Sequence, residues 1–281
     1  MPTTGELDRT RAEQTATWDA VSDGWLAWTE DFERAAAAVS AELVRLGGVR
    51  AGQSVLDYGT GLGEPALTAA DVVGPTGEVV GVDLSPRMVE RARERAAGRP
   101  GVRFLVGGAE VVPGGHDVVL SRWVLPLAGD RPGLLRALRA AMRPGGVLAA
   151  AVWGPPAEVP MIALGFGVVS RLLALDPPPP GPGPFSLADP EALRAEPAAA
   201  GFRDVEVTEL AVDFRLASPD AFAGFTLDVL PPRPRAALRA RYGDERHPDV
   251  HRALVEAAGR YLVDGGGVRL PSRCLLVRAV A

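Results

Sequence analysis

The 281-residue sequence contains no lysine, so all 30 of its basic residues are arginines. This absence excludes a nucleotide-binding P-loop, because that loop needs a lysine on the phosphates. It also excludes pyridoxal-phosphate and aldolase-type chemistry, because both need a lysine amine to form a Schiff base.

Cysteine and long apolar runs are scarce as well. Cys274 is the single cysteine, so no intrachain disulfide can form; it lies in an apolar run typical of a core and suits a reducing compartment. The first eleven residues carry Glu6 and Asp8, so we expect no secretory signal there. The very hydrophobic stretch 161–175 is interrupted by Arg171 and is shorter than a membrane span. We therefore expect a cytoplasmic protein that does not enter a membrane.

Negative charge exceeds positive charge, at a formal net charge of −5. We expect no nucleic-acid partner, because phosphate binding needs a basic surface. The arginine-rich segment 87–99 contains Glu90 and Glu94 at helical spacing, which indicates a solvated, ion-paired helix face. The expected partner is a small-molecule substrate, and the sequence leaves a homodimer open.

Short apolar runs alternate with helical patterns along most of the chain. Each run is almost continuously apolar, as expected when helices cover both faces of a parallel sheet. We predict an α/β fold, with a doubly wound, mainly parallel, seven-stranded Rossmann-like sheet and a helical cap. The predicted strands are 54–58, 78–83, 102–106, 116–121, 146–152, 204–214 and 274–280. The predicted helices lie within 11–46 (two helices) and at 64–72, 85–97, 132–142, 161–175 and 189–200.

A single domain over residues 1–281 accommodates this pattern. The core sheet is assigned to about 50–155, 204–214 and 274–281, and the helical cap to 1–49, 156–200 and 215–272. An insertion as long as the one before the last strand indicates a cap or lid rather than a plain loop. The proline-rich segment 177–184 is expected to form an extended polyproline connector.

Three glycines, Gly59, Gly61 and Gly63, follow the first strand and precede a helix. Such glycines let the backbone approach a ligand and direct helix N–H groups toward it. Glu64 stands where a dinucleotide fingerprint needs its third glycine, and a carboxylate there disfavours a pyrophosphate. Asp57, at the end of the strand, could instead bind an ammonium group. S-adenosylmethionine (SAM) carries such a group and a dinucleotide does not.

A second acidic residue, Asp83, ends the next strand. A nucleoside-binding sheet places a carboxylate there to accept both ribose hydroxyls. Both Asp57 and Asp83 could also be helix-capping residues, and Ser85-Pro86 after Asp83 favours that alternative.

The segment Val55-Leu-Asp-Tyr-Gly-Thr-Gly-Leu-Gly-Glu-Pro-Ala-Leu67 resembles motif I of the class I SAM-dependent methyltransferases. Residues 74–88 resemble motif II, and Met142-Arg-Pro-Gly-Gly-Val-Leu148 resembles the Leu-Arg-Pro-Gly-Gly turn of that family. Residues 14–215 follow the pattern of its UbiE-like small-molecule branch. The resemblance implies SAM as cofactor and a natural-product-like small molecule as methyl acceptor.

Residue by residue, the resemblance assigns the methionine end of SAM to the loop, the ribose to Asp83 and the adenine to residues after the second and third strands. The implied cofactor-binding residues are Asp57, Gly59, Thr60, Gly61, Gly63, Asp83, Leu84, Met88, Gly108, Ala109, Glu110, Ser121 and Arg122. The implied substrate-binding residues are Trp25, Trp123, Trp153 and Phe185. One departure is Gly108, where the family often has an aspartate that meets the adenine amine; either Glu110 replaces it or adenine is held more weakly.

No residue is an obvious general base. Methyl transfer from a sulfonium needs no acid for its leaving group, so positioning and desolvation can suffice. His116 begins a buried strand and is interpreted as structural. His251 is a weak catalytic candidate; a metal role with His247 is disfavoured by Pro248, and we predict no metal. The alternatives are a methyltransferase-fold cyclase or lyase that keeps the methyl group, and a non-catalytic relative that has lost SAM binding.

Overall fold

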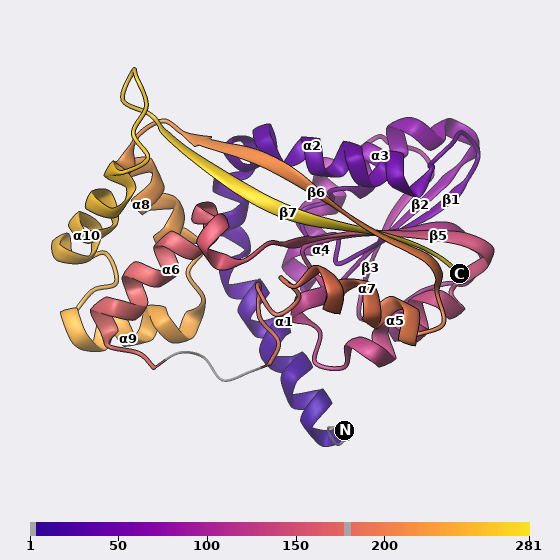
Figure 1. Cartoon of the computed structure of the whole chain (residues 1–281), viewed down its shortest axis with the longest axis horizontal. Coiled ribbons are helices and arrows are strands. Elements are labelled where there is room, and N and C mark those ends of the chain that lie inside the picture. Colours follow the sequence, from indigo (N-terminus) through magenta and orange to yellow (C-terminus); the bar gives the residue numbers. More distant parts are fainter. Residues whose placement is uncertain (1–3, 177–180) are drawn as a thin grey trace.

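A computed structural model of the chain describes residues 4–176 and 181–281, and its centre is one seven-stranded sheet (Figure 1). The strands are ordered β3-β2-β1-β4-β5-β7-β6, and the first five run parallel. β7 is antiparallel to both of its neighbours, β5 and β6. The strands are β1 (Ser54–Tyr58), β2 (Glu78–Asp83), β3 (Val102–Val106), β4 (His116–Arg122), β5 (Met142–Trp153), β6 (Arg203–Leu216) and β7 (Val268–Val280). The predicted doubly wound, mainly parallel sheet is confirmed.

Helices cover both faces of this sheet, which explains the nearly continuous apolar strands. Val55 of β1 points into one core and Leu56 into the other, and both side chains are fully buried. One face packs against α2 (Thr29–Gly47), α3 (Ala66–Val73) and α4 (Pro86–Arg95), and the other against α5 (Arg131–Ala140) and α7 (Pro190–Ala199). Residues 29–47, assigned to the cap from the sequence, thus lie directly on the sheet as α2.

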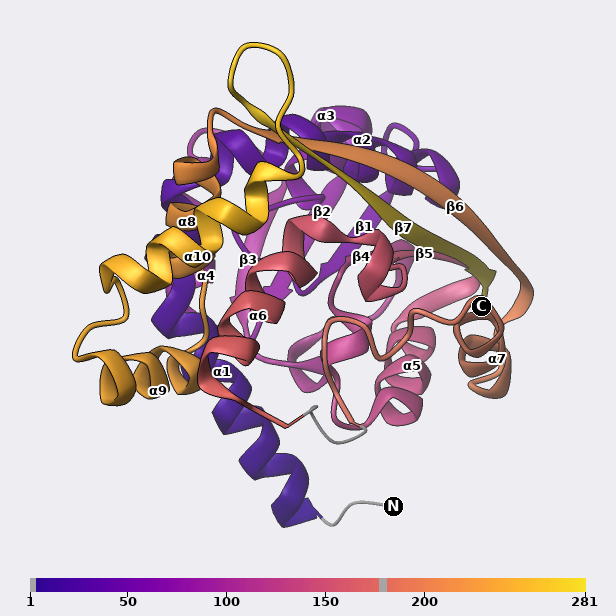
Figure 2. The ribbon, with the colours of Figure 1, turned by 60° about the vertical axis from the view of Figure 1, so that its left-hand side comes forward.

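A cluster of helices stands beyond one end of the sheet, at the left of Figure 1. It consists of α6 (Pro160–Leu173), α8 (Pro219–Asp228), α9 (Pro232–Tyr242) and α10 (Pro248–Gly259). The long first helix, α1 (Thr4–Ala27), contacts α4 as well as α8 and α9, so it links the sheet layer to the cluster (Figure 2). None of the helices in the described parts of the chain is long and apolar enough to cross a membrane. The single-domain organisation stays a prediction.

The last strand is longer than the sequence predicts. β5 pairs with β7 only as far as Cys274, whereas β6 continues beside β7 to Val268. The extension contains Arg269 and Pro271 and alternates between buried and exposed residues, so it lacks the apolar run by which the other strands were predicted. Cys274 itself is buried, and burial raises the pKa of its thiol to about 12, which confirms its core position. The expected polyproline connector falls largely on residues 177–180, outside the described residues.

Candidate functional site

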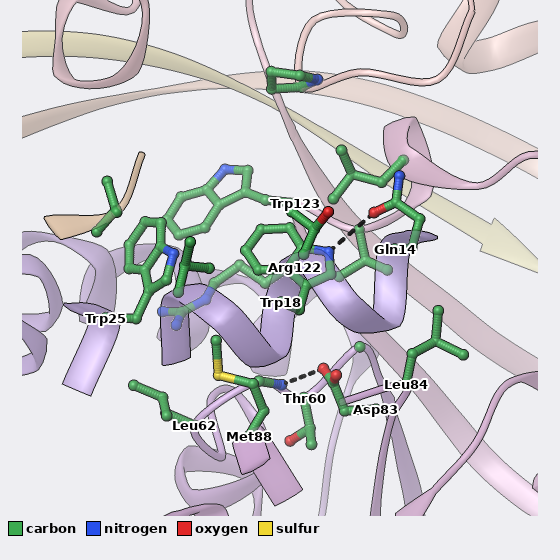
Figure 3. Close-up of a pocket in the computed structure, with 18 of the residues that line it drawn as sticks. Gln14, Trp18, Trp25, Thr60, Leu62, Asp83, Leu84, Met88, Arg122 and Trp123 are labelled. Carbon is green, nitrogen blue, oxygen red and sulfur yellow. Dashed lines mark hydrogen bonds between the residues drawn. The ribbon is translucent and has the colours of Figure 1, made fainter. Parts of the chain in front are cut away.

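A cavity of about 460 Å³ opens above the carboxyl ends of β1, β2 and β4. This is the point where the strand order reverses, and it is where doubly wound sheets bind ligands. The volume suits a small molecule or cofactor. Figure 3 shows Asp83, Leu84 and Met88 at one end and Trp25, Arg122 and Trp123 at the other, with α1 across the cavity.

The glycine loop forms one wall of the cavity. Gly59 and Gly61 line it and have φ angles of +74° and +51°, a conformation that favours glycine. Gly63, at φ +103°, does not line the cavity. A Cβ atom at Gly59 would lie 2.2 Å from Cγ2 of Val124, so a side chain there would collide with Val124, which also lines the cavity. The first glycine is therefore required both by its backbone angle and by close packing.

Asp57 lies directly behind the loop and is fully buried. Its Oδ2 accepts a hydrogen bond from the backbone N–H of Ala66 at 3.0 Å, so it does act at the start of α3, as the capping alternative supposed. Its Oδ1 has no hydrogen-bond partner among the described residues. Burial raises the pKa of Asp57 to about 7, although the Thr60 hydroxyl, the Ala66 N–H and the charge of Arg122 favour the ionised form. A buried carboxylate oxygen without a partner suits a cationic ligand.

Asp83 is the last residue of β2; it accepts a hydrogen bond from the loop after β1 and lines the cavity. Its Oδ2 accepts from the N–H of Gly61 at 2.8 Å (Figure 3), and its Oδ1 accepts from the N–H of Ser85 at 2.9 Å. Ser85 caps α4, as the sequence predicted, by accepting from the N–H of Met88. Ser85, and not Asp83, is therefore the capping residue of α4, while Asp83 braces the loop and the cap residue and forms a wall of the cavity.

The first helix supplies a wall of the cavity, and on it the sequence pointed to Trp25 but not to Gln14 or Trp18. Gln14 and Trp18 line the cavity, and the indole Nε1 of Trp18 donates to Oε1 of Gln14 at 3.1 Å. Asp19 holds the helix in place by accepting hydrogen bonds from the hydroxyl of Ser85 and the N–H of Arg87. Trp18 and Trp25 are seven residues apart, which places them on one helix face, but that spacing also fits an ordinary core.

Aromatic side chains concentrate at the opposite end. Trp123 and Trp153 stack with ring centroids 4.2 Å apart and an interplanar angle of 6°. Phe32 meets the edge of Trp123 at 5.4 Å and that of Trp25 at 5.1 Å. Four of the five tryptophans of the chain line this one cavity. Trp123 also has a φ of +63°, a strained conformation that is commonest at functional sites in proteins.

An ion pair lies between the glycine-loop end and the aromatic end of the cavity. Arg122, at the end of β4, donates from Nη2 to Oε1 of Glu33 at 2.5 Å and from Nη1 to Oε2 at 2.9 Å. Nη1 also meets the hydroxyl of Ser40 at 2.8 Å. Burial alone would lower the pKa of Arg122, but the charge and hydrogen bonds of Glu33 outweigh it and raise that pKa. The sequence pointed to Arg122, but nothing in it indicated Glu33.

Several predicted site residues lie outside the cavity lining. Ser121 is buried and donates to the carbonyl of Tyr58, which itself lines the cavity. The Glu110 carboxylate accepts from the N–H of Gly108 and pairs with Arg11, and Glu110 does not line the cavity. The neighbouring Gly107 does. The other residues predicted to bind but absent from the lining are Asp57, Gly63, Gly108, Ala109 and Phe185.

His251 is the clearest departure from the sequence interpretation. It lies on α10 with Nε2 3.7 Å from Oδ1 of Asp220 and does not line the cavity, and α10 lies on the outer side of the helix cluster (Figure 1). None of the three histidines lines the cavity; His116 is buried with Nδ1 3.0 Å from the hydroxyl of Ser54, which confirms its structural interpretation. Among the described residues, no group of His, Cys, Asp and Glu side chains could hold a metal ion.

Comparison with known proteins agrees with this geometry. Residues 50–160 match a family model described as a methyltransferase domain. The chain is 33% identical over 233 residues to Nocamycin O-methyltransferase from Saccharothrix syringae, covering 72% of the chain and 80% of that relative. It is 33% identical over 104 residues to demethylmenaquinone methyltransferase from Staphylococcus aureus, covering 36% of the chain and 43% of that protein.

Among solved structures, the fold matches a phosphoethanolamine N-methyltransferase from Haemonchus contortus in complex with phosphomonomethylethanolamine and S-adenosylhomocysteine. The TM-score is 0.52 at 22% identity, over 90% of this chain and 52% of that one. The chain spans only 26–43% of the length of several other curated relatives. The long match to a methyltransferase, together with the family model over the glycine loop, shows that the chain belongs to the SAM-dependent methyltransferase family.

Proposed function

We propose that this methyltransferase acts on a small, largely apolar, natural-product-like acceptor. The observation that carries the proposal is a single cavity that joins the glycine loop and Asp83 to a chamber lined by aromatic side chains. An acceptor bound there would lie beside the cofactor and away from water. The 33% identity to Nocamycin O-methyltransferase supports an acceptor of this class.

The residues of the cofactor end fit SAM. The partnerless Oδ1 of Asp57 suits a nearby positive charge, and Asp83 lines the cavity as a hydrogen-bond acceptor. Leu84 and Met88 provide apolar contact suited to an adenine ring. When bound, SAM supplies a methyl group on a positively charged sulfur.

The role of the protein is then to hold the acceptor and exclude water. Displacement at a methyl group requires the acceptor atom in line with the breaking bond, and such positioning can supply much of the rate. The stacked Trp123 and Trp153, with Ile162 and Phe166 of α6, would hold an apolar acceptor in one orientation. We also propose, from the net charge of −5, that nucleic acid is not the substrate. A cytoplasmic location and a homodimer stay predictions.

Incubation with methyl-labelled SAM and a cell extract tests the proposal. We expect S-adenosylhomocysteine together with a small product heavier by one methyl group. A product that forms without S-adenosylhomocysteine would favour the cyclase or lyase alternative, and the absence of SAM binding in calorimetry would favour a non-catalytic protein.

Asp83→Ala should weaken SAM binding about 30-fold. The variant loses the hydrogen bonds that we expect the Asp83 carboxylate to accept from the ribose hydroxyls of SAM. Hydrogen bonds to such a charged acceptor are worth about 2 kcal/mol. Titration calorimetry with SAM measures the effect. Asp189→Ala is the matched control, since Asp189 also accepts from the N–H two residues later, at 3.0 Å, but lies at α7 outside the cavity. An unchanged affinity in Asp83→Ala removes Asp83 from the site.

SAM affinity should rise as the pH rises through about 7. Because burial raises the pKa of Asp57 to about 7, the unliganded protein holds a proton there that a cationic ligand must displace. For the same reason the unliganded protein should lose stability from about pH 4, where the unfolded chain ionises, to about pH 7. Calorimetry in two buffers of different ionisation enthalpy should detect proton release near pH 6.5.

Asp57→Asn should bind SAM without proton release, whereas Asp117→Asn, on β4 outside the cavity, should retain it. Equal proton release by wild type and Asp57→Asn would assign the titration to another group.

A further inference from the structure

Glu33 is the acidic residue of the cavity that the cofactor end does not use. Among the described residues that line the cavity, the carboxylates are Glu33, Glu64 and Asp83. Asp83 accepts from the loop and from α4, and Glu64 accepts from the N–H and hydroxyl of Thr68 at 3.3 and 2.6 Å. Glu33 comes instead from the second turn of α2, next to Phe32 of the aromatic chamber.

Arg122 holds the Glu33 carboxylate in a fixed orientation. Each oxygen accepts one N–H of the guanidinium, at 2.5 and 2.9 Å. A carboxylate has about four acceptor positions, so this pairing leaves Glu33 free to accept from a further donor. The side chain of Arg122 is 8% exposed and that of Glu33 is 22% exposed, so the open side of the pair is the carboxylate. The geometry therefore presents an acceptor of hydrogen bonds rather than a free cation.

The pair stands at the boundary between the two ends of the cavity. The charges of Asp57 and Glu64, on the glycine-loop side, act on Arg122 and favour its charged form. On the other side its guanidinium lies 4.9 Å from the ring centroid of Trp123. A group that accepts a proton during methyl transfer must be near the atom that receives the methyl, and that atom lies where the two ends meet.

The chamber next to Glu33 is built for a flat molecule. The parallel pair Trp123 and Trp153 and the edge-on Phe32 provide the stacked and edge-to-face surfaces that aromatic rings prefer. Histidine is absent from the described lining, and burial raises the pKa of Tyr58 to about 12, which leaves its phenol protonated at neutral pH. Of the carboxylates in the described lining, Glu33 is the one beside the aromatic chamber, and we take it as the candidate to receive a proton.

We propose that the acceptor is an aromatic hydroxyl compound, a phenol, and that Glu33 binds its O–H and takes its proton. The proposal rests on the proposed methyl transfer. The phenol oxygen forms a bond to the methyl carbon while the bond between carbon and sulfur breaks and its electron pair stays on sulfur. The phenol proton passes to the Glu33 carboxylate, and S-adenosylhomocysteine and the aryl methyl ether leave. A carboxylate suffices as base because the hydroxyl becomes strongly acidic as its oxygen forms the new bond.

Three probes with one ring system test the acceptor class: 1-naphthol, 1-naphthylamine and 1-naphthoic acid, each with methyl-labelled SAM. We expect the wild-type protein to methylate 1-naphthol in preference to the other two, since Glu33 repels a carboxylate and Arg122 is already neutralised. Preference for the amine or the acid, or no methylation of any probe by protein that binds SAM, overturns the inference. If S-adenosylhomocysteine still forms with a cell extract, the proposed function survives; if it does not, that function fails too.

Glu33→Gln tests the proton transfer. Its turnover of 1-naphthol should fall about 100-fold or more, the scale of general base catalysis, while its affinity for SAM stays within about threefold. With 4-nitro-1-naphthol, which is already ionised at neutral pH, the fall should be under about tenfold. A purely structural role would reduce both turnovers equally, and that result, like an unchanged turnover, contradicts the inference.

Two further variants make the test robust. Glu30→Gln, at an exposed position one turn earlier in the chain and outside the cavity, should behave as wild type. Glu33→Asp keeps a carboxylate on a shorter side chain and should retain more 1-naphthol turnover than Glu33→Gln. If Glu33→Gln does not fold, Glu33→Asp decides: its loss must be larger for 1-naphthol than for 4-nitro-1-naphthol, and equal losses overturn the assignment.

Discussion

Gly59→Ala should abolish measurable SAM binding and destabilise the fold. The new Cβ would lie 2.2 Å from Cγ2 and 2.6 Å from Cγ1 of Val124, and φ at this residue is +74°. The left-handed conformation costs a non-glycine residue about 1–2 kcal/mol. The forced shift of a packed wall adds about 1–3 kcal/mol. Because Gly59 and Val124 both line the cavity, any movement that relieves the collision must also deform the cofactor end.

The matched control is Gly98→Ala. Gly98 has a similar φ of +82°, but a Cβ there would meet nothing within 4 Å. This variant should lose only the conformational part, about 1–2 kcal/mol, and should bind SAM normally. Urea denaturation and calorimetry on both variants separate backbone strain from the collision. If Gly59→Ala binds SAM as well as Gly98→Ala does, the close approach of the loop to Val124 has no functional importance.

Arg122→Met should lower the free energy of unfolding by about 3 kcal/mol, the lower end of the range for breaking a buried ion pair. The variant leaves the Glu33 carboxylate, 22% exposed, without the guanidinium that contacts both of its oxygens. It also removes a positive charge that favours the ionised form of Asp57, so the pKa of Asp57 should rise further. Urea denaturation measures the first effect, and proton release on SAM binding measures the second.

Arg34→Met provides the comparison for a surface pair. Arg34 contacts Asp31 at 2.9 Å with side chains 61% and 36% exposed, and such pairs contribute about 0–1 kcal/mol. The double variant Arg122→Met with Glu33→Gln should regain part of the stability lost in Arg122→Met, because no unpaired charge remains. A double variant with the summed loss of both single variants would show that the two side chains do not interact in the folded protein.

Much of the architecture could be predicted from local sequence. The strands of the parallel sheet are short apolar runs, and Ser85-Pro86 marks a helix start that the structure confirms. The extension of β7 could not be predicted in this way, because 268–273 pairs with β6 and not with β5, and its residues alternate between buried and exposed. Local patterns therefore predicted the helices and strands whose own residues show a regular hydrophobic pattern.

The residues of the site also differ in whether the local sequence could predict them. The glycine loop and Asp83 lie within one stretch of chain, and Glu64, Asp57 and the resemblance to the family motifs indicated a SAM site rather than a dinucleotide site. Glu33 and Arg122 are 89 residues apart, and no local pattern relates them. His251 was considered because its neighbours are polar, yet α10 carries it away from the cavity.

The sequence by itself determined the family, the fold and the cofactor, because motifs that bind a shared cofactor must keep a fixed spacing on one strand, loop and helix. Only the tertiary structure decided which side chains from distant segments line the cavity. Trp18, Glu33 and Phe166 come from α1, α2 and α6 and meet in the cavity only because the fold brings these helices together. Side chains that converge from distant segments leave no periodic signal in the sequence, so the acceptor end had to be seen in three dimensions.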